Sequence, residues 1–388
     1  MTATRTIRIL SVQPVAERGG SDQALLRLVR SLPRDEFDFH IAVPGRAPLE
    51  AAFVAAGASV HEVPMHRLST SHGPTEWFRY VAAWPLAVAR LVRLVRRLDV
   101  DVIHTNSLHS LYGWAAARVT RRPHVWHARE VVVQSGVALR LERFLCRHFA
   151  SRVIAVSYAV AAQLDPANVV VLDEYLDLEE FAPAHAGRFR SEIELSDGAP
   201  LVGAVARLDP LKGLDPLLDA FALVRANRPD ARLVIVGSPV LGHQHYEAAL
   251  AARVAADPTV FLLRPRDDIP EVIADLDVLA LPSIEPESYG LVLVEALASG
   301  VPVVATDHGG PPEIAARADP ASARLVAPGD VDALAAALLE LLPAETSTTD
   351  RRARPRRIAL PPARFANLFR AVVGRAQPRG DDTRVTRE

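Results

Sequence analysis

Short runs of β-branched and apolar residues alternate along the chain with longer segments, rich in Ala, Leu and Arg, in which apolar residues recur at the helical period. Runs of the first kind are typical of buried strands, and segments of the second kind are typical of helices that cover a sheet. The alternation predicts βα units, which build parallel sheets with helices on both faces.

The first series of units predicts a Rossmann-like domain over 1–182. We interpret its short apolar runs as strands at 7–12, 39–43, 59–63, 102–105, 124–127, 152–156 and 169–172. Its expected helices lie near 22–31, 47–56, 76–98, 108–120, 138–149 and 158–164.

A second series predicts another Rossmann-like domain over 183–343. Its expected strands are 201–206, 232–237, 260–263, 278–281, 301–306 and 323–326. Its expected helices lie near 213–226, 243–256, 268–275, 290–299, 311–316 and 331–342. At 388 residues the chain exceeds what one hydrophobic core usually organises, so two domains with a ligand cleft between them are expected.

Two segments interrupt the alternation. Residues 177–200 are interpreted as the connection between the domains, with a hinge, because they contain several prolines and glycines. Residues 344–362 lose all periodicity and are rich in Thr, Arg and Pro, which predicts an exposed, irregular connection. A final helix over 363–375 is expected to pack back on the first domain, and 376–388 to form a flexible tail.

The composition is that of a globular protein, with 49% hydrophobic and 23% charged residues. The formal net charge is −2, so no overall basic field favours a nucleic-acid partner. The single cysteine, Cys146, excludes an intramolecular disulfide and fits a reducing compartment. Because the first residues also lack the apolar core of a signal peptide, we expect a cytoplasmic protein.

The helix expected over 86–98 is amphipathic. It places Arg90, Arg93, Arg96 and Arg97 on one face and aliphatic residues on the other. Such a helix fits a weak peripheral contact with an anionic membrane, at its inner face, and it equally fits an ordinary helix that covers a Rossmann sheet. Of these two interpretations we favour the ordinary helix.

The most informative segment is 282–300, which reads PSIEPESYGLVLVEALASG and is followed by the run 301–306 and a Gly-Gly pair. Its glutamates Glu287 and Glu295 are separated by seven residues. This segment resembles glycosyltransferase family 4, in which two glutamates at that spacing flank a strand-to-helix turn. The resemblance extends over nearly the whole chain. It implies the α/β GT-B fold, with two Rossmann-like domains that face a central cleft.

The chemistry of the segment agrees with this resemblance. Gly290 follows a strand end and opens a helix, whose free N–H groups and dipole favour a diphosphate. The resemblance implies that Glu287 contacts the donor sugar and that Glu295 contacts the ribose; the alternative is a helix-start carboxylate and a solvated helix position. The donor-binding residues expected here are Glu287, Ser288, Tyr289, Gly290, Leu291 and Glu295.

A second cluster, 205–213, resembles the strand-end arginine and lysine of the family. Arg207 offers a planar fork to phosphate oxygens and Lys212 a mobile point charge, so the two can neutralise a leaving diphosphate without a metal. The alternative is a surface ion pair in a βα loop. The resemblance makes both residues catalytic and donor-binding.

Three features of the first domain complete the predicted site. Gly19 and Gly20 follow the first strand, in a loop that closes over the donor phosphates in the family. His127 occupies the family's histidine position beside the transferred sugar, where it would donate to a hydroxyl or relay a proton. Arg129 is assigned to the acceptor side. The alternative for His127 is a hydrogen-bonded histidine at a strand end.

The resemblance therefore predicts a retaining hexosyltransferase that uses a nucleotide sugar, with a UDP- or GDP-sugar expected. The acceptor is a hydroxyl of a small metabolite, a glycan or a lipid-linked molecule. No cofactor is expected, because the second domain lacks an Asp-x-Asp pair at a strand end and the chain lacks Cys ligands for a metal. The alternatives are a sugar-nucleotide epimerase or phosphorylase of the same fold, and a catalytically silent scaffold.

Two departures from the family pattern concern the donor pocket. Residues 172–181 stand where the family usually has an Asn-Gly turn, and 261–265 replace a strand end that contains glycine. Both changes bear on which nucleotide the protein selects.

Overall fold

The computed structural model describes residues 5–15, 19–66, 74–132, 136–164, 167–240, 242–345, 347–360 and 364–376. The chain forms two compact units. Unit 1 comprises Met1–Tyr175 and Pro362–Glu388, and unit 2 comprises Leu176–Pro361. The boundary thus follows Tyr175, whereas the sequence had suggested 182. The expected tail, 376–388, lies outside the described residues except for its first residue.

Unit 1 is built on a seven-stranded sheet in which all neighbouring strands are parallel. In spatial order its strands are β3 (Ser59–Glu62), β2 (Phe37–Val43), β1 (Ile7–Val12), β4 (Val102–Thr105), β5 (His124–Ala128), β6 (Arg152–Ala155) and β7 (Val169–Val171). Its helices are α1 (Gly20–Ser31), α2 (Glu50–Ala55), α3 (Pro74–Leu98), α4 (Tyr112–Thr120), α5 (Gly136–Phe149), α6 (Tyr158–Ala162) and α15 (Phe365–Ala376).

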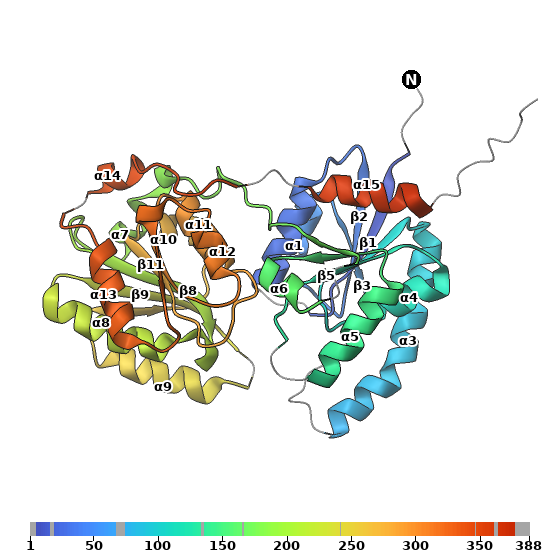
Figure 1. Cartoon of the computed structure of the whole chain (residues 1–388), viewed down its shortest axis with the longest axis horizontal. Coiled ribbons are helices and arrows are strands. Elements are labelled where there is room, and N and C mark those ends of the chain that lie inside the picture. The colour runs from blue at the N-terminus through green and yellow to red at the C-terminus, as the bar shows by residue number, and fades with distance from the viewer. Residues whose placement is uncertain are drawn as a thin grey trace, which may run out of the picture. The chain divides into compact units, whose positions relative to one another are not determined.

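Helices lie on both faces of the unit 1 sheet (Figure 1), and its central strands are largely buried. Ile9 packs in a core with α1, α2 and α15, whereas its neighbour Leu10 packs in a core with α3 and α4. Successive side chains of a strand point to opposite faces, so a strand with two covered faces must be apolar throughout. This is why the strands appear in the sequence as continuous apolar runs.

The last helix, α15, belongs to unit 1 although it follows unit 2 in the chain. Phe365, Phe369 and Val372 are buried in the same core as Ile9. The ring of Phe369 meets Phe37 of β2 edge-on, with centroids 6.5 Å apart. At 25 cal/mol per Å² of apolar area, burying three such side chains contributes roughly 5 to 9 kcal/mol.

The apolar stripe of α3 covers the sheet. Val88, Leu91, Val92 and Val95, on which the membrane interpretation of 86–98 depended, are buried in the core with α4. That stripe is therefore not available for insertion into a lipid surface, because the sheet already occupies it.

Unit 2 contains a six-stranded parallel sheet. Its strands, in spatial order, are β10 (Val260–Leu263), β9 (Arg232–Pro239), β8 (Leu201–Leu208), β11 (Val278–Leu281), β12 (Val303–Thr306) and β13 (Ala323–Val326). Its α-helices are α7 (Arg188–Glu192), α8 (Leu214–Asn227), α9 (Gln244–Ala255), α10 (Ile269–Ala274), α11 (Leu291–Ala298), α12 (Pro311–Ala315), α13 (Val331–Leu341) and α14 (Thr348–Arg352). Three short 3-10 helices are η1 (Pro183–His185), η2 (Pro210–Lys212) and η3 (Pro320–Ser322).

The prediction of two Rossmann-like domains is confirmed. In unit 2, α8, α9 and α13 share one core with the sheet, through residues such as Phe221, Leu250 and Leu338. The helices α10, α11 and α12 lie on the other side (Figure 1).

The order of the strands defines a switch point in each sheet. From β1 the chain builds outward to β2 and β3 and then crosses to β4, on the other side of β1. From β8 it builds to β9 and β10 and then crosses to β11. In open α/β sheets, ligands bind outside the carboxyl ends of the strands at such a point. The fold therefore directs attention to the ends of β1 and β4 and to the ends of β8 and β11.

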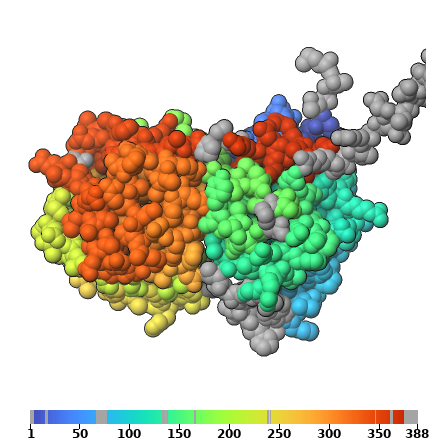
Figure 2. All heavy atoms as spheres, in the orientation of Figure 1, coloured from blue at the N-terminus to red at the C-terminus, as the bar shows by residue number. Residues whose placement is uncertain are grey.

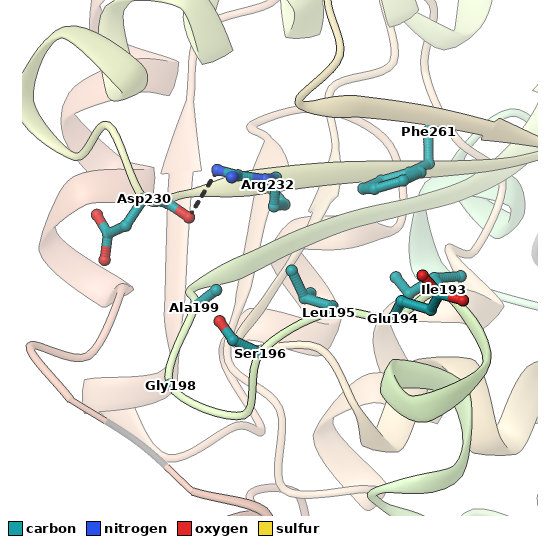
Figure 3. A pocket seen from close by; sticks show the side chains of 9 residues that line it. All are labelled: Ile193, Glu194, Leu195, Ser196, Gly198, Ala199, Asp230, Arg232 and Phe261. Atoms are coloured by element: carbon teal, nitrogen blue, oxygen red, sulfur yellow. Dashed lines mark hydrogen bonds between the residues drawn. The ribbon is translucent and has the colours of Figure 1, made fainter.

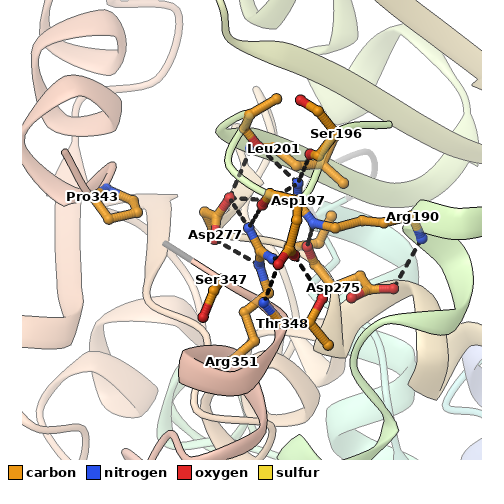
Figure 4. Close-up of polar contacts among 12 residues, drawn as sticks. Arg190, Ser196, Asp197, Leu201, Asp275, Asp277, Pro343, Ser347, Thr348 and Arg351 are labelled. Carbon is orange, nitrogen blue, oxygen red and sulfur yellow. Dashed lines mark hydrogen bonds and ion pairs between the residues drawn. The ribbon is translucent and has the colours of Figure 1, made fainter. Parts of the chain in front are cut away.

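The stretch 344–362 differs from its prediction as an exposed, irregular connection. Residues Thr348–Arg352 form the helix α14, which starts with a capping box between Ser347 and Asp350. Arg351 is fully buried and is paired with Asp197 and with Asp277 (Figure 4). The local sequence is polar and aperiodic and does not by itself predict a packed segment. The ion pair of Arg351 with the buried Asp277, which lies in another segment, accounts for its packing.

Asp277 anchors several segments of unit 2. It accepts hydrogen bonds from Arg190 of α7 at 2.7 Å, from Arg354 at 2.7 Å and from the backbone N–H of Leu201 at 2.9 Å. These hydrogen bonds attach the 177–200 connection, through Arg190, and the 347–358 segment, through Arg354, to the amino edge of the sheet. A buried carboxylate requires such partners, because an unpaired charge in the interior is strongly destabilising.

Candidate active site

At the switch point of unit 2, β8 ends in a turn that presents two cations. Arg207 is the second-last residue of β8, and its side chain is half exposed, 3.7 Å from the carboxylate of Asp209. Asp209 caps η2 by accepting the N–H of Leu211 at 2.9 Å. Lys212 ends η2 and lies at the same edge. The short 3-10 helix connects the strand end that carries Arg207 to Lys212, so both cations lie at this edge of the sheet.

Lys212 forms an ion pair with Glu287, 75 residues further along the chain. The same oxygen of Glu287 accepts a hydrogen bond of 2.5 Å from the hydroxyl of Ser283. Both the lysine and the glutamate side chains are mostly shielded from solvent. A backbone hydrogen bond connects the two loops that carry these residues: the N–H of Ile284 donates to the carbonyl of Leu211 at 2.8 Å.

The backbone around Glu287 is held by two glycines after β12. The N–H of Gly310 donates to the carbonyl of Glu287 at 2.8 Å. Gly309 has φ +78°, and a Cβ built on it would lie 2.1 Å from that carbonyl oxygen. Only a glycine permits this conformation and this approach. The Gly-Gly pair therefore positions the backbone of Glu287.

The helix α11 begins directly after this loop. Gly290, with φ +95°, is its N-cap, and Ser288, Leu291 and Tyr289 flank it. Ser288 and Leu291 are half-buried, and Tyr289 is buried. The unpaired N–H groups at the start of a helix favour an anion. Glu295 lies inside α11 and is 7% exposed, so it is not the solvated position of the alternative interpretation.

The switch point of unit 1 carries a buried polar network. Arg129 forms an ion pair with Glu174, and both side chains are almost completely buried. The Nε of Arg129 donates to Asn106 at 2.7 Å, and the amide of Asn106 donates to Gln13 at 2.8 Å. Gln13 follows β1 and Asn106 follows β4, so the network spans the two strands at which the topology switches.

His127 lies in the interior beside this network. It is 0% exposed, and its ring lies 5.4 Å from that of His104 and 5.9 Å from that of Phe365 in α15. Burial, then the neighbouring charge of Arg129 and the electrostatic effect of His104, holds the pKa of His127 well below its usual range. Burial likewise lowers the pKa of His104 to about 3. Both rings are therefore neutral near pH 7.

The hydrogen bonds assign the tautomer of His127. The Nη2 of Arg129, which can only donate, lies 3.4 Å from Nδ1 of His127. Nδ1 must therefore accept, also from Nε2 of His104 at 3.2 Å, while Nδ1 of His104 accepts from Ser11 at 2.9 Å. Nε2 of His127 then carries the hydrogen, and among the described residues it has no partner.

Comparisons with known proteins decide the family. Residues 187–359 match the family described as glycosyl transferases group 1, and residues 19–172 match the glycosyl transferase 4-like domain. The chain is 30% identical to a D-inositol 3-phosphate glycosyltransferase of Mycolicibacterium gilvum (strain PYR-GCK), over 90% of this chain and 84% of the relative. This chain belongs to the group 1 glycosyltransferases.

Two further similarities bear on this glycosyltransferase. A GDP-mannose-dependent monoacylated alpha-(1-6)-phosphatidylinositol monomannoside mannosyltransferase of Corynebacterium glutamicum is 37% identical over 43% of this chain and 45% of the relative. The crystal structure of Anabaena Alr3699/HepE in complex with UDP and glucose matches with a TM-score of 0.74 and 24% identity, over 95% of both chains. At that identity the structural likeness shows the fold, which is GT-B.

The structure brings some of the predicted site residues together. Glu287 and Lys212 are in contact, and Arg207 and Gly290 lie at the same edge of the unit 2 sheet. In unit 1, Gly19 caps α1 and Gly20 is its first residue, after the end of β1. No neighbouring atom lies within 4 Å of a Cβ built on Gly20, so nothing inside the unit requires a glycine there.

His127 and Arg129 are more deeply buried than the sequence had suggested. Arg129 is bound to Glu174 in the interior and does not present its guanidinium at the surface. His127 is equally enclosed, and its contact with a sugar stays a prediction. Burial arises from α15 and from the 172–176 segment, which are far from both residues in the sequence.

Sequence reasoning missed several residues that hold the site together. These are Ser283, which bonds Glu287, and Gln13, Asn106 and Glu174, which bond one another or Arg129. One signal was present in the sequence: Lys212 is the only lysine among 44 lysines and arginines. A chain that otherwise uses arginine keeps a lysine at this point, where a point charge contacts Glu287.

A hollow of about 530 Å³ lies at the other edge of the unit 2 sheet (Figure 3). It is bordered by the 193–199 loop, by Asp230 and Arg232 at the start of β9, and by Phe261. The guanidinium of Arg232 donates to the backbone carbonyl of Asp230 at 2.9 Å, so its charge is engaged. This hollow lies at the amino edge and is separate from Glu287, which lies at the carboxyl edge.

Within the described residues, no three His, Cys, Asp or Glu side chains are grouped so that they could hold a metal ion. In the same part of the chain, no helix has the length and apolarity needed to cross a bilayer. Metal-independent activity stays a prediction.

Proposed function

We propose that this glycosyltransferase takes a hexose from a nucleotide sugar bound by unit 2 and transfers it, with retention, to an acceptor hydroxyl. The observation that carries the proposal is the Lys212–Glu287 pair at the β8/β11 switch point, next to Arg207 and the start of α11. The names of relatives support a nucleotide sugar: one is GDP-mannose-dependent, and one solved structure contains UDP and glucose.

The donor diphosphate fits the positive groups of this edge. Arg207 is half exposed and its nearest carboxylate, Asp209, is 3.7 Å away, so a phosphate would meet little competition. Lys212 and the first N–H groups of α11 add a mobile and a fixed positive charge. Together they would stabilise the negative charge that develops on the diphosphate when the bond to the sugar breaks.

When a donor binds, Lys212 and Glu287 would each exchange their mutual contact for a contact with a different part of the ligand. Without a donor, the two charges compensate each other inside a shielded site. The diphosphate would accept hydrogen bonds from the ammonium group of Lys212. The sugar hydroxyls would donate to the carboxylate of Glu287, which Ser283 continues to hold in place. Glu295, one and a half turns further into α11, would accept from the ribose.

The proposed reaction keeps its groups on one face of the sugar. The bond between the anomeric carbon and the diphosphate oxygen breaks, and the acceptor oxygen forms its bond from the same side. The proton of the acceptor hydroxyl passes to the departing diphosphate oxygen. No carboxylate is then needed as an inverting base, and the fixed cations replace a metal ion.

In unit 1, the proposed contribution of His127 is its Nε2–H. A buried donor without an acceptor is costly, so an oxygen of the ligand placed there would be favourable. Arg129 would act at a distance from the ligand, by fixing Nδ1 of His127 as an acceptor and holding the end of β4 through Asn106.

The single lysine permits a direct test of the donor site. Reductive methylation with ¹³C-formaldehyde labels Lys212 and the terminal amine only, so NMR reports on one side chain. UDP or GDP should shift the Lys212 signal and protect the amine from methylation, and Arg207→Ala should weaken both effects. An unchanged signal with every nucleotide and nucleotide sugar would contradict the proposed site.

Turnover separates glycosyl transfer from the alternatives. Nucleotide release from UDP- and GDP-sugars should depend on an acceptor and should persist after EDTA treatment. An epimerase would convert the sugar without release, and a silent scaffold would do neither. The configuration of the first-formed product, measured by NMR, tests retention.

A further inference from the structure

The outer faces of α3 and α5 carry large apolar side chains that are more than half exposed. On α3, Phe78 is 73% and Val81 is 60% exposed, and Leu86, five residues after Val81, is 55% exposed. On α5, Leu141 and Phe144 are also more than half exposed. We call these five residues the apolar surface. Clusters of this kind on a protein surface mark contacts with partners or membranes.

The charged residues on the same faces are basic. From Phe78 to the end of α3 there is no Asp or Glu, and the only acid of α5, Glu142, is buried and bonded to His109. The exposed arginines on these faces are Arg79, Arg93, Arg96, Arg97, Arg140 and Arg143. The protein as a whole has a net charge of −2, so this basic face is a local property.

These arginines also differ from others on the surface. Arg225, Arg253 and Arg324 of unit 2 each form an ion pair with a carboxylate. In the described part of the chain, no carboxylate lies within ion-pair distance of Arg93, Arg96, Arg97 or Arg143. The charge of Arg97 acts on His61, where it helps burial to lower the pKa of the imidazole. Their charge is therefore available to an anionic partner.

The two helices lie on the same side of the unit 1 sheet. The indole of Trp114 in α4 and the guanidinium of Arg118 both contact Phe149 of α5, and α3 packs along α4. Figure 1 shows α3, α4 and α5 side by side, and Figure 2 shows atoms of α3 in blue and of α5 in green at the surface. In parallel α/β units the helices begin at the carboxyl edge. Phe78, Val81 and Leu86 lie in the first half of α3, and Leu141 and Phe144 lie near the middle of α5.

We propose that the outer faces of α3 and α5 dock unit 1 on an anionic lipid bilayer, with the apolar surface inserted among the acyl chains and the arginines on the phosphate headgroups. The combination of apolar and basic groups is what such an interface requires. A nucleic acid or an acidic protein would use the arginines but would give no reason to expose Phe78 and Phe144. The inference does not depend on the proposed donor chemistry.

This surface is not the apolar face that the sequence suggested over 86–98. That face is buried against the sheet, whereas the exposed apolar residues come from the first half of α3 and from α5. An acceptor embedded in the bilayer would then reach unit 1 without leaving the membrane.

Binding of the full-length protein to vesicles tests the proposal. Vesicles of phosphatidylcholine and phosphatidylglycerol in equal parts should retain the protein in co-sedimentation, and pure phosphatidylcholine vesicles should retain much less. Binding to the mixed vesicles should weaken as salt rises, because exposed charges are screened over about 10 Å at 0.1 M salt. Equal binding to both kinds of vesicle, or to neither, would overturn the proposal.

Two variants separate the basic from the apolar contribution. The triple variant Arg93→Gln, Arg96→Gln, Arg97→Gln should bind the mixed vesicles roughly a hundredfold less tightly, at about fivefold for each arginine. The double variant Phe78→Ser, Phe144→Ser should lose at least about tenfold on vesicles and should bind heparin as the parent does. If the double variant binds vesicles like the parent, the surface recognises polyanions and not a bilayer.

Matched controls come from unit 2. Leu223 of α8 and Arg188 of α7 are exposed, so Leu223→Ser and Arg188→Gln remove the same kinds of group elsewhere. Both controls should bind vesicles like the parent, and loss of binding in either would contradict the proposed surface. Thermal unfolding of all variants shows whether they are folded. Nucleotide shifts of Lys212 measure the donor site separately, so failure of one proposal leaves the other testable.

Discussion

The two sheets place an arginine at comparable positions, and the structure treats them in opposite ways. Arg207 is the second-last residue of β8, at the switch point of unit 2, and is half exposed, with one carboxylate at 3.7 Å. Arg129 follows β5 in unit 1 and is enclosed, paired with Glu174 and bonded to Asn106. The same residue type is therefore available to a ligand in one unit and committed to the fold in the other.

This difference shows that burial and pairing with a carboxylate decide whether an arginine at a strand end is available to bind a ligand. At the edge of β8 and β11 the described residues leave the Arg207 side chain half exposed, whereas at the edge of unit 1 Phe365 of α15 packs on His127 and Glu174 pairs with Arg129. A buried ion pair stabilises only if all its partners are present. An exposed cation contributes little to stability and keeps its charge for a ligand.

The largest effect is expected when the buried pair of unit 1 is broken. Arg129→Met leaves Glu174 charged in the interior and should lower the free energy of unfolding by about 3 to 5 kcal/mol. All four tryptophans belong to unit 1, so urea unfolding followed by tryptophan fluorescence measures this unit selectively.

The double variant Arg129→Met, Glu174→Met should recover most of the lost stability, because it removes both charges. Arg207→Ala is the matched variant in unit 2 and should change stability by less than about 0.5 kcal/mol. If Arg207→Ala destabilises as much as Arg129→Met, the contrast between the two edges is wrong.

The next effect concerns catalysis. Lys212→Ala removes a cation from the proposed diphosphate site and should reduce turnover roughly a hundred- to a thousandfold, with the fold intact. Arg207→Ala should act in the same direction. Steady-state turnover after EDTA treatment measures both. Activity that vanishes with EDTA and returns with magnesium, while either variant stays near the parent, would refute stabilisation by fixed cations.

A smaller effect is expected from the residue that positions Glu287. Ser283→Ala removes the hydroxyl that donates to this carboxylate and should reduce turnover about tenfold, since a hydrogen bond to a charged group contributes about 1.5 kcal/mol or more. Ser283→Thr keeps the hydroxyl and should restore most of the activity. Equal activity of the alanine variant and the parent would show that Ser283 does not hold Glu287 in the reaction.

The last expected effect is a dependence of unit 1 stability on pH. Burial lowers the pKa of His104 and of His124 to about 3, whereas the ordinary value is 6.5. Below about pH 6.5 the unfolded chain takes up protons that the folded state refuses, so stability is full above that pH and falls progressively towards pH 3. Each histidine should cost about 1.4 kcal/mol per pH unit.

Urea unfolding by tryptophan fluorescence at about pH 7.5 and about pH 5.5 measures this loss. His124→Gln removes one titrating group, and its side-chain amide can replace the hydrogen bond to Thr105. The variant should lose about 1.4 kcal/mol less than the parent between the two pH values. An identical loss would mean that His124 does not carry this dependence.

Most of the secondary structure could be predicted from the sequence. The strands β1, β4, β10, β11 and β13 have the expected bounds, because each is a short run rich in apolar and β-branched residues. The fold class followed from the alternation of these runs with helical segments. Lys212 and Glu287 could be named from a motif, although only the structure shows that they touch.

Sequence by itself therefore determined the βα architecture, the family resemblance and the strand-end motifs, because these depend on local periodicity and short spacing. Tertiary structure alone decided which polar groups are enclosed. His127 is covered by Phe365 of α15, Arg129 is neutralised by Glu174, and Arg351 is drawn into the interior by Asp277. Burial and ion pairing join residues that are tens to hundreds of positions apart, and no local pattern of hydrophobic and polar residues encodes such a partner.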